Sequence, residues 1–196
     1  MGTANDRIIA ASLACCLASV LAGCGAGPYG FGREYVPLRE ERALHEQGVE
    51  YPYAAIVTGP TEYQGKLLAW FGVVEAMDQA PDGRYLVRMA HRKHQERHLC
   101  DGESSDSCRV TVQFSSQGGF SALVDFRPAD LVPGLDKVQP GTLLRIFGKV
   151  RCEENDDEQV ECEYDEQGGI VLDASWYRQW PARYYVTTRA AGGMRR

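Results

Sequence analysis

Residues 65–77 read GKLLAWFGVVEAM, a run of apolar, aromatic and β-branched side chains that is followed by the turn-forming residues APDG at 80–83. Such a run between turn signals is typical of a β-strand. A second run of this kind, TLLRIFGKV, occupies residues 142–150. Each run carries one glycine in its interior, Gly72 or Gly148, and a glycine in mid-strand usually marks a bulge or a sharp bend. We therefore expect two curved strands of a small barrel.

Between and after these runs, further strand-like segments alternate with Gly/Pro turns: RYLVRMAHRKHQERHL (84–99), RVTVQF (109–114), GGFSALVDF (118–126) and ECEYDEQGGIVLDASWYRQW (161–180). The segment RPADLVPGLDKVQPG (127–141) reads as a short crossing, and LREERALHEQG (38–48) as a short helix that ends at Gly48. The pattern predicts a mainly β fold. About five strands with a break after the third favour a small antiparallel OB-like barrel, and a sandwich or barrel of six to eight strands is the alternative.

The amino terminus has the pattern of a bacterial export signal. The apolar run from Ile8 to Ala22 spans 15 residues, too few to cross a bilayer, and it ends in Leu21-Ala22-Gly23-Cys24. This tetrapeptide resembles the lipobox of bacterial lipoproteins. The resemblance implies that residues 1–23 form a signal helix that is removed and that Cys24 becomes the lipid-bearing first residue. Residues 24–60 are then a Gly/Pro-rich tether, 61–187 the β-barrel domain and 188–196 a flexible basic tail.

Export into an oxidising compartment changes the expected chemistry of the remaining cysteines, which are Cys100, Cys108, Cys152 and Cys162. Four cysteines allow three disulfide connectivities. We favour Cys100–Cys108 and Cys152–Cys162, because each pair encloses a polar segment between apolar stretches, as at the neck of a hairpin. Zinc binding is the less favoured alternative, since the C-x₂-C spacing is absent.

The domain resembles a known family in three places. EYQGKLLAWFGVVEAM (62–77), DLVPGLDKVQPGTLLRIFGKV (130–150) and WYRQWPARYYV (176–186) are similar to segments of the Slp-type outer-membrane starvation lipoproteins. The chain departs from that pattern at Phe71-Gly72, where a second glycine is expected, and in its two cysteine-bounded insertions. The resemblance implies an envelope-associated, stress-linked outer-membrane lipoprotein with no agreed catalytic residues. We expect the chain to be lipid-anchored in the outer membrane and to face the periplasm.

Three histidines, His91, His94 and His98, lie close together in the sequence. On the strand expected there, side chains alternate, so His94 and His98 point one way and His91 the other. Because Arg92, Lys93 and Arg97 would repel a cation, we favour a solvent-exposed basic strand over a metal site. Protonation below about pH 6.5 would then add positive charge to this strand.

Five aromatic residues are concentrated near the carboxyl end: Trp176, Tyr177, Trp180, Tyr184 and Tyr185. Aromatic side chains at this density can form part of the core, a surface that contacts a partner or the envelope, or a small-ligand pocket. The acidic segment 153–166 reads as a solvated hairpin tip, with weak divalent-cation binding or docking on a basic surface as alternatives. It lacks the spacing of a calcium loop.

The formal net charge is −6, which disfavours nucleic acid as a partner. None of the common catalytic or nucleotide-binding motifs is present, so we expect no enzyme and no cofactor. We expect an envelope lipoprotein with a binding or structural role and a protein partner in the envelope. The alternative is a periplasmic lipoprotein that binds a small ligand or a metal through the aromatic segment or the histidines.

Overall fold

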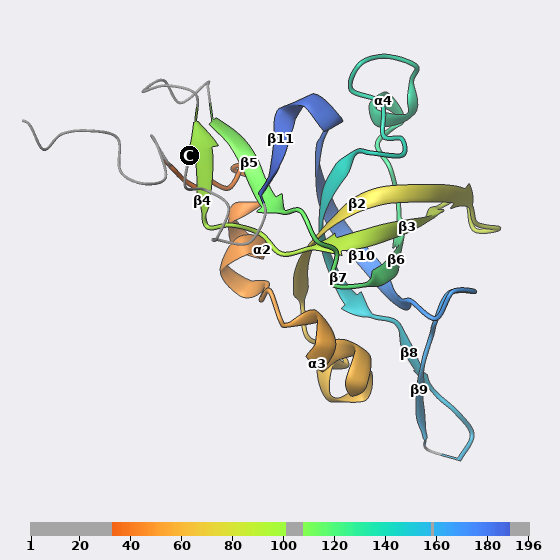
Figure 1. Ribbon diagram of the computed structural model, residues 1–196. Coiled ribbons are helices and arrows are strands. Elements are labelled where there is room, and N and C mark those ends of the chain that lie inside the picture. Colours follow the sequence, from red (N-terminus) through yellow and green to blue (C-terminus); the bar gives the residue numbers. More distant parts are fainter. Residues whose placement is uncertain (1–32, 101–107, 158, 189–196) are drawn as a thin grey trace, which may run out of the picture.

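The computed structural model describes residues 33–100, 108–157 and 159–188. A closed five-stranded barrel and a separate four-stranded sheet contain most of the β-strands of the described residues (Figure 1). The expected mainly β architecture with a small barrel is therefore confirmed. The four-stranded sheet, here called the outer sheet, is a second β layer that the sequence did not predict.

The barrel strands follow one another around the wall as β2 (Leu68–Gln79), β3 (Tyr85–Arg92), β6 (Gly119–Val124), β10 (Ile170–Trp180) and β7 (Leu143–Val150). β7 closes the ring by pairing with β2. Neighbouring strands are antiparallel except at β6 and β10, which pair in parallel with Ile170 opposite Phe120. The expected antiparallel barrel is thus corrected at one seam. β6 and β10 run in the same direction because β7, which lies between them in the sequence, runs in the opposite direction to β10.

The two mid-strand glycines permit close approach. A Cβ on Gly72 would lie 2.8 Å from the ring of Phe120 inside the barrel, and a Cβ on Gly148 would lie 2.7 Å from the carbonyl oxygen of Asp173. The wall itself bends at β-bulges in β2 and β10. Gly148 lies opposite the β10 bulge, as the sequence suggested, whereas Gly72 makes room for a large interior side chain.

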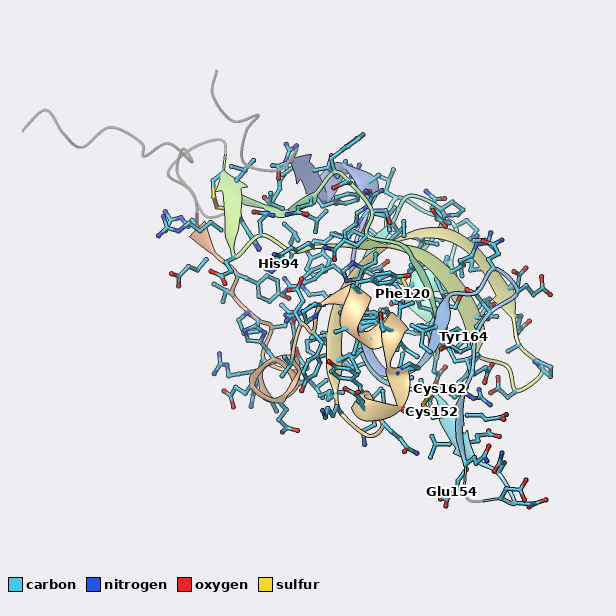
Figure 2. The ribbon with its side chains drawn as sticks, turned by 60° about the horizontal axis from the view of Figure 1, so that its bottom comes forward. His94, Phe120, Cys152, Glu154, Cys162 and Tyr164 are labelled. Atoms are coloured by element: carbon cyan, nitrogen blue, oxygen red, sulfur yellow. A yellow bond between two sulfur atoms is a disulfide. The ribbon has the colours of Figure 1, made fainter. Side chains whose placement is uncertain are left out.

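The barrel interior is filled by large apolar side chains. Trp70 and Phe120 are fully buried and meet edge to face with ring centroids 5.2 Å apart; Figure 2 shows Phe120 within the barrel. Other members of this core are Leu68, Val74, Val87, Met89, Ala122, Leu144, Ile146, Ile170, Leu172 and Tyr177. Residues between these point outward, because successive side chains of a strand face opposite sides.

The outer sheet contains β1 (Arg33–Glu34), β4 (Arg97–Cys100), β5 (Cys108–Gln113) and β11 (Tyr185–Thr188), in that order. The long strand expected over residues 84–99 is therefore divided: its first half is β3 of the barrel and its second half is β4 of the outer sheet. A second apolar core lies between the two layers and contains Phe71, Val110, Val112, Leu143 and Trp180.

Short helices connect and cover these layers: α2 (Arg42–Gln47), α3 (Tyr53–Thr58), α4 (Pro128–Leu131) and the 3₁₀ turns η1 (Pro60–Tyr63) and η3 (Ala182–Tyr184). α2 ends at Gly48, whose N–H donates to the Leu44 carbonyl oxygen, as the sequence indicated. α3 places Ile56 in the barrel core. Among the described residues, no helix is both long and apolar enough to span a bilayer.

Both expected disulfides are present. Cys100–Cys108 joins β4 to β5, and Cys152–Cys162 joins β8 (Cys152–Glu154) to β9 (Val160–Cys162). In each hairpin the two cysteines are directly paired residues of antiparallel strands. Figures 1 and 2 show the β8–β9 hairpin projecting from the barrel, with Glu154 beyond the disulfide.

Part of the expected tether belongs to the folded unit. Residues 33–60 include β1, α2 and α3, and both Glu41 and Ile56 are fully buried. The signal helix, the lipobox with Cys24 and residues 189–196 of the expected tail lie outside the described residues.

Candidate functional site

A groove of about 520 Å³ lies between the outer sheet and the end of β10; we call it the Tyr35 groove. It brings together two sequence segments that we had singled out separately, since His98, Trp180 and Tyr184 all line it. Its other lining residues are Arg33, Glu34, Tyr35, Val36, Cys108, Val110, Asp136, Arg178, Gln179 and Pro181. The volume is within the range of about 300–1,000 Å³ that is usual for small-ligand sites.

A buried carboxylate holds the polar groups behind the groove. Glu41 has no exposed surface and accepts hydrogen bonds from the Tyr35 hydroxyl, the Leu38 amide at 3.0 Å, Arg145 at 2.6 Å and Arg178 at 3.0 Å. Burial alone would raise the pKa of Glu41, but the Tyr35 hydrogen bond and the other donors lower it below its ordinary value. Glu41 is therefore a buried anion, and both of its carboxylate oxygens accept hydrogen bonds from the protein.

Two arginines share this single carboxylate. Arg145, whose side chain is 6% exposed, gives Nη1 to Glu41 and Nη2 to His45 Nδ1, and its guanidinium lies over the rings of Tyr35, Phe71 and Phe147. Its Nε is buried without a partner in the described part of the chain. Arg178 is 22% exposed, lines the groove and lies over the Trp180 ring at 4.8 Å. The rings stabilise both cations by cation–π interaction.

The ring of Tyr35 is the centre of the cluster. It makes edge contacts with His94, His98 and Trp180, with centroids 5.3–6.4 Å apart. Burial and the hydrogen bond to Glu41 raise the pKa of Tyr35 to about 12, so its hydroxyl remains a donor at neutral pH.

His94 and His98 meet as the alternation predicted, with their Nε2 atoms 3.2 Å apart. The expectation of an exposed basic strand is wrong, however: His98 is 8% exposed, His91 is 1% exposed, and the ring of His94 stacks on Phe71 at 4.4 Å. Figure 2 shows His94 near the outer sheet. The chain turns between β3 and β4, and this turn carries the histidine segment inward over the second core.

Burial sets the charge of these two imidazoles. It lowers the pKa of His94 to about 3, with a contribution from His98, and the pKa of His98 to about 4, with a contribution from Arg178. Burial also lowers the pKa of His45, as does Arg145. All three are neutral at pH 7, and the expected gain of charge below about pH 6.5 does not hold for His94 and His98. No group of three or more metal-ligating side chains occurs in the described residues.

His91 belongs to a different environment. It points into the barrel between Trp70, Tyr53 and Phe120, with centroids 4.9–6.1 Å away. Neither ring nitrogen has a hydrogen-bond partner in the described residues, and burial lowers the pKa of His91 to about 4. His91 is therefore a neutral residue of the barrel core and does not belong to the cluster of His94 and His98.

The five aromatic residues near the carboxyl end divide among four environments. Tyr177 is in the barrel core, where its hydroxyl bonds to Asp130, and Trp176 packs on Phe147. Trp180 is in the second core and Tyr185 packs against it; Tyr184 is 48% exposed at the groove. Only Trp180 and Tyr184 line the groove.

A second pocket, of about 350 Å³, lies beside β3, β6 and the loop 165–169. Its carboxylate, Asp165, already accepts hydrogen bonds from the Ser121 hydroxyl and from the amides of Gln167 and Gly169. The Tyr53 hydroxyl likewise donates to the Gly119 carbonyl oxygen. Because the protein itself uses these polar groups, we regard the Tyr35 groove as the stronger candidate.

Four residues of the cluster were missed in the sequence: Tyr35, Glu41, Arg145 and Arg178. Arg145 gave one usable signal, because it interrupts the apolar run LLRIF, and an arginine within a buried strand needs a partner. Tyr35 and Glu41 lie within residues 24–60, for which the sequence predicts a tether that contains one short helix over 38–48.

No family model matches this chain, and neither the curated proteins nor the solved structures contain a match. The fold and the groove therefore have to be interpreted from their own geometry.

Proposed function

We propose that this chain is a lipid-anchored lipoprotein of the bacterial outer membrane that faces the periplasm and binds a small ligand in the Tyr35 groove. The anchor is Cys24, attached through the lipobox Leu21-Ala22-Gly23-Cys24, and the binding unit is the barrel with its outer sheet. Membership of the Slp-type lipoproteins is part of this proposal. We propose that the protein binds its ligand without catalysing a reaction. The proposal also includes a protein partner in the envelope.

The proposed barrel type is the OB-fold. Its support is the strand order around the wall, β2-β3-β6-β10-β7, with a parallel pair between the third and the last strand along the chain. A short helix, α4, occurs between the third and fourth barrel strands. A small Greek-key barrel of this kind places ligands on its outer surface, because side chains fill its interior.

One observation carries the binding function: the Tyr35 groove combines an open, half-apolar volume with a fixed polar base. Trp180 and Tyr184 supply flat apolar walls, while Glu41 holds Tyr35 and Arg178 in place. Ligand sites typically pair a mostly apolar lining with a few oriented polar groups.

The anchor is tested by intact-mass analysis of the protein purified from membranes of its native host. We expect a chain that begins at Cys24 and carries diacylglycerol and an amide-linked acyl group. Cys24→Ala should leave the leader uncut and the protein without lipid. A wild-type protein that retains residues 1–23 with a free thiol at position 24 would contradict the anchor.

The groove is tested by ligand-observed NMR with a set of small aromatic fragments. Tyr184→Ala removes an exposed groove wall, and we expect it to weaken fragment binding about three- to tenfold, as loss of one stacking contact does. Tyr164→Ala is the matched control, because Tyr164 is 47% exposed and does not line the groove. Equal binding by both variants and the wild type would rule the groove out as the site.

A further inference from the structure

The charges around the Tyr35 groove do not cancel. Arg145 and Arg178 are both within bonding distance of one carboxylate, Glu41. His45, His94 and His98 are neutral at pH 7 for the reasons given above. Glu50, the other acid packed near the histidines, accepts a hydrogen bond from the His94 amide at 3.1 Å and forms no ion pair with either arginine in the described residues. Its carboxylate faces Lys93 as well as Arg145, and Lys93 offsets its charge. One positive charge is therefore left over behind the groove.

The charges at the rim do not remove this excess. The groove is lined by two acids, Glu34 and Asp136, and by Arg33 in addition to Arg178. Asp136 is 76% exposed and lies 3.9 Å from Arg183. The two rim acids are thus balanced by two rim arginines, Arg33 and Arg183, and the positive charge of the buried cluster remains.

Arg178 has hydrogen-bond donors to spare. A guanidinium carries five N–H groups. Every hydrogen bond that the described residues make with the Arg178 side chain uses Nη1, which donates to the Tyr35 hydroxyl oxygen at 3.0 Å, the Val36 carbonyl at 3.3 Å and Glu41 at 3.0 Å. The donors on Nε and Nη2 are left for a ligand, on a side chain that Glu41 and Trp180 hold rigid. A guanidinium positioned in this way favours an oxyanion such as a carboxylate or phosphate, to which two parallel hydrogen bonds can be made.

From this geometry we infer that the ligand of the Tyr35 groove is a small organic anion, a carboxylate or phosphate joined to an aromatic or apolar body. The oxyanion lies against the free edge of Arg178, and the apolar body lies along Trp180, Tyr184 and Val36. This inference rests on the proposed binding function of the groove and names its ligand class.

The test uses two ring probes of nearly equal shape, phenylacetate and phenylacetamide, with the lipid-modified full chain in detergent and isothermal titration calorimetry as the readout. We expect phenylacetate to bind at least about tenfold more tightly, since hydrogen bonds to an ionised group are the stronger kind. Its affinity should fall with added salt and stay level between about pH 6 and pH 8, because His98 remains neutral there. Inorganic phosphate distinguishes a preference for phosphate from one for carboxylate.

Arg178→Gln should remove the preference for phenylacetate, and Arg178→Lys should restore it only in part because a lysine lacks the fork. Arg151→Gln is the matched control: it removes a cation whose side chain is 33% exposed and does not line the groove, and it leaves the Glu41 cluster intact. Thermal unfolding of each variant shows whether it is folded, and the comparison of the two probes on the wild type does not depend on any variant.

The two proposals fail in different ways. Equal binding of the two probes, or a preference for the amide, would overturn the anion inference while the groove remains a ligand site. If neither probe nor phosphate binds more tightly than about 10 mM, both the anion inference and the proposed binding function are refuted.

Discussion

Glu41→Gln should lower the free energy of unfolding by about 3–5 kcal/mol, the largest loss that we expect from any single polar substitution in this protein. The glutamine keeps the shape of the side chain but removes the charge that faces Arg145 and Arg178. Two guanidiniums would then share a buried site without a counterion, and the amide would place N–H donors against N–H donors. Urea denaturation at pH 7 measures the change.

Two further variants show whether charge is the cause. Glu153→Gln removes an acid that is 83% exposed and lies 3.9 Å from Arg151, and it should leave the unfolding midpoint nearly unchanged. Combining Glu41→Gln with Arg145→Met should cost less than the sum of the two single changes, because the uncompensated charge is removed together with its partner. Strict additivity would mean that the two residues stabilise the fold independently.

Acid should destabilise this protein well above the range in which its carboxylates titrate. The pKa of His91 and of His98 is about 4, that of His94 is about 3, and the ordinary value is 6.5. Between pH 6.5 and about 4 these histidines are therefore protonated in the unfolded chain and neutral in the folded chain. The free energy of unfolding falls as the pH falls through that window. Each histidine should cost about 2 kcal/mol at pH 5 relative to pH 7.

His91→Leu isolates one of these contributions. Since His91 has no hydrogen-bond partner in the described structure, an apolar side chain of similar size should leave stability at pH 7 unchanged or slightly higher. The loss of stability between pH 7 and pH 5 should shrink by about 2 kcal/mol. Met89→Leu, a change at an interior position of the same strand without a titrating group, should keep the wild-type slope. A slope that is equally steep in His91→Leu would show that His91 has the same pKa in the folded and the unfolded protein.

The barrel was predictable because the sequence of each of its main strands is typical of a β-strand. GKLLAWFGVVEAM and TLLRIFGKV are apolar on both faces, and the disulfides could be assigned because each cysteine pair brackets a polar tip. The outer sheet was not predictable in the same way. Nothing local in RKHQERHL tells whether it continues β3 or leaves the barrel, because that choice depends on where the second core forms.

The groove illustrates the same limit. The histidine pattern correctly placed His94 and His98 on one side, and the aromatic segment pointed to Trp180 and Tyr184. These residues come together only in the tertiary structure, because β10 ends next to the outer sheet. The group that organises the groove, Glu41, is the residue immediately before the six-residue helix α2. The sequence predicts a short helix there, but within a Gly/Pro-rich tether, and it does not indicate that this segment packs on the barrel.

The wall formed by β2, β7 and β10 has consequences for how the protein loses its structure. Trp70 and Phe71 are neighbours in β2, yet one fills the barrel and the other fills the second core. Detaching the outer sheet would expose Phe71, Leu143 and Trp180 to water, and distorting the barrel would remove the surface on which the outer sheet rests. The two layers should therefore melt together in one cooperative transition, with equal calorimetric and van't Hoff enthalpies, although the chain contains two separate cores.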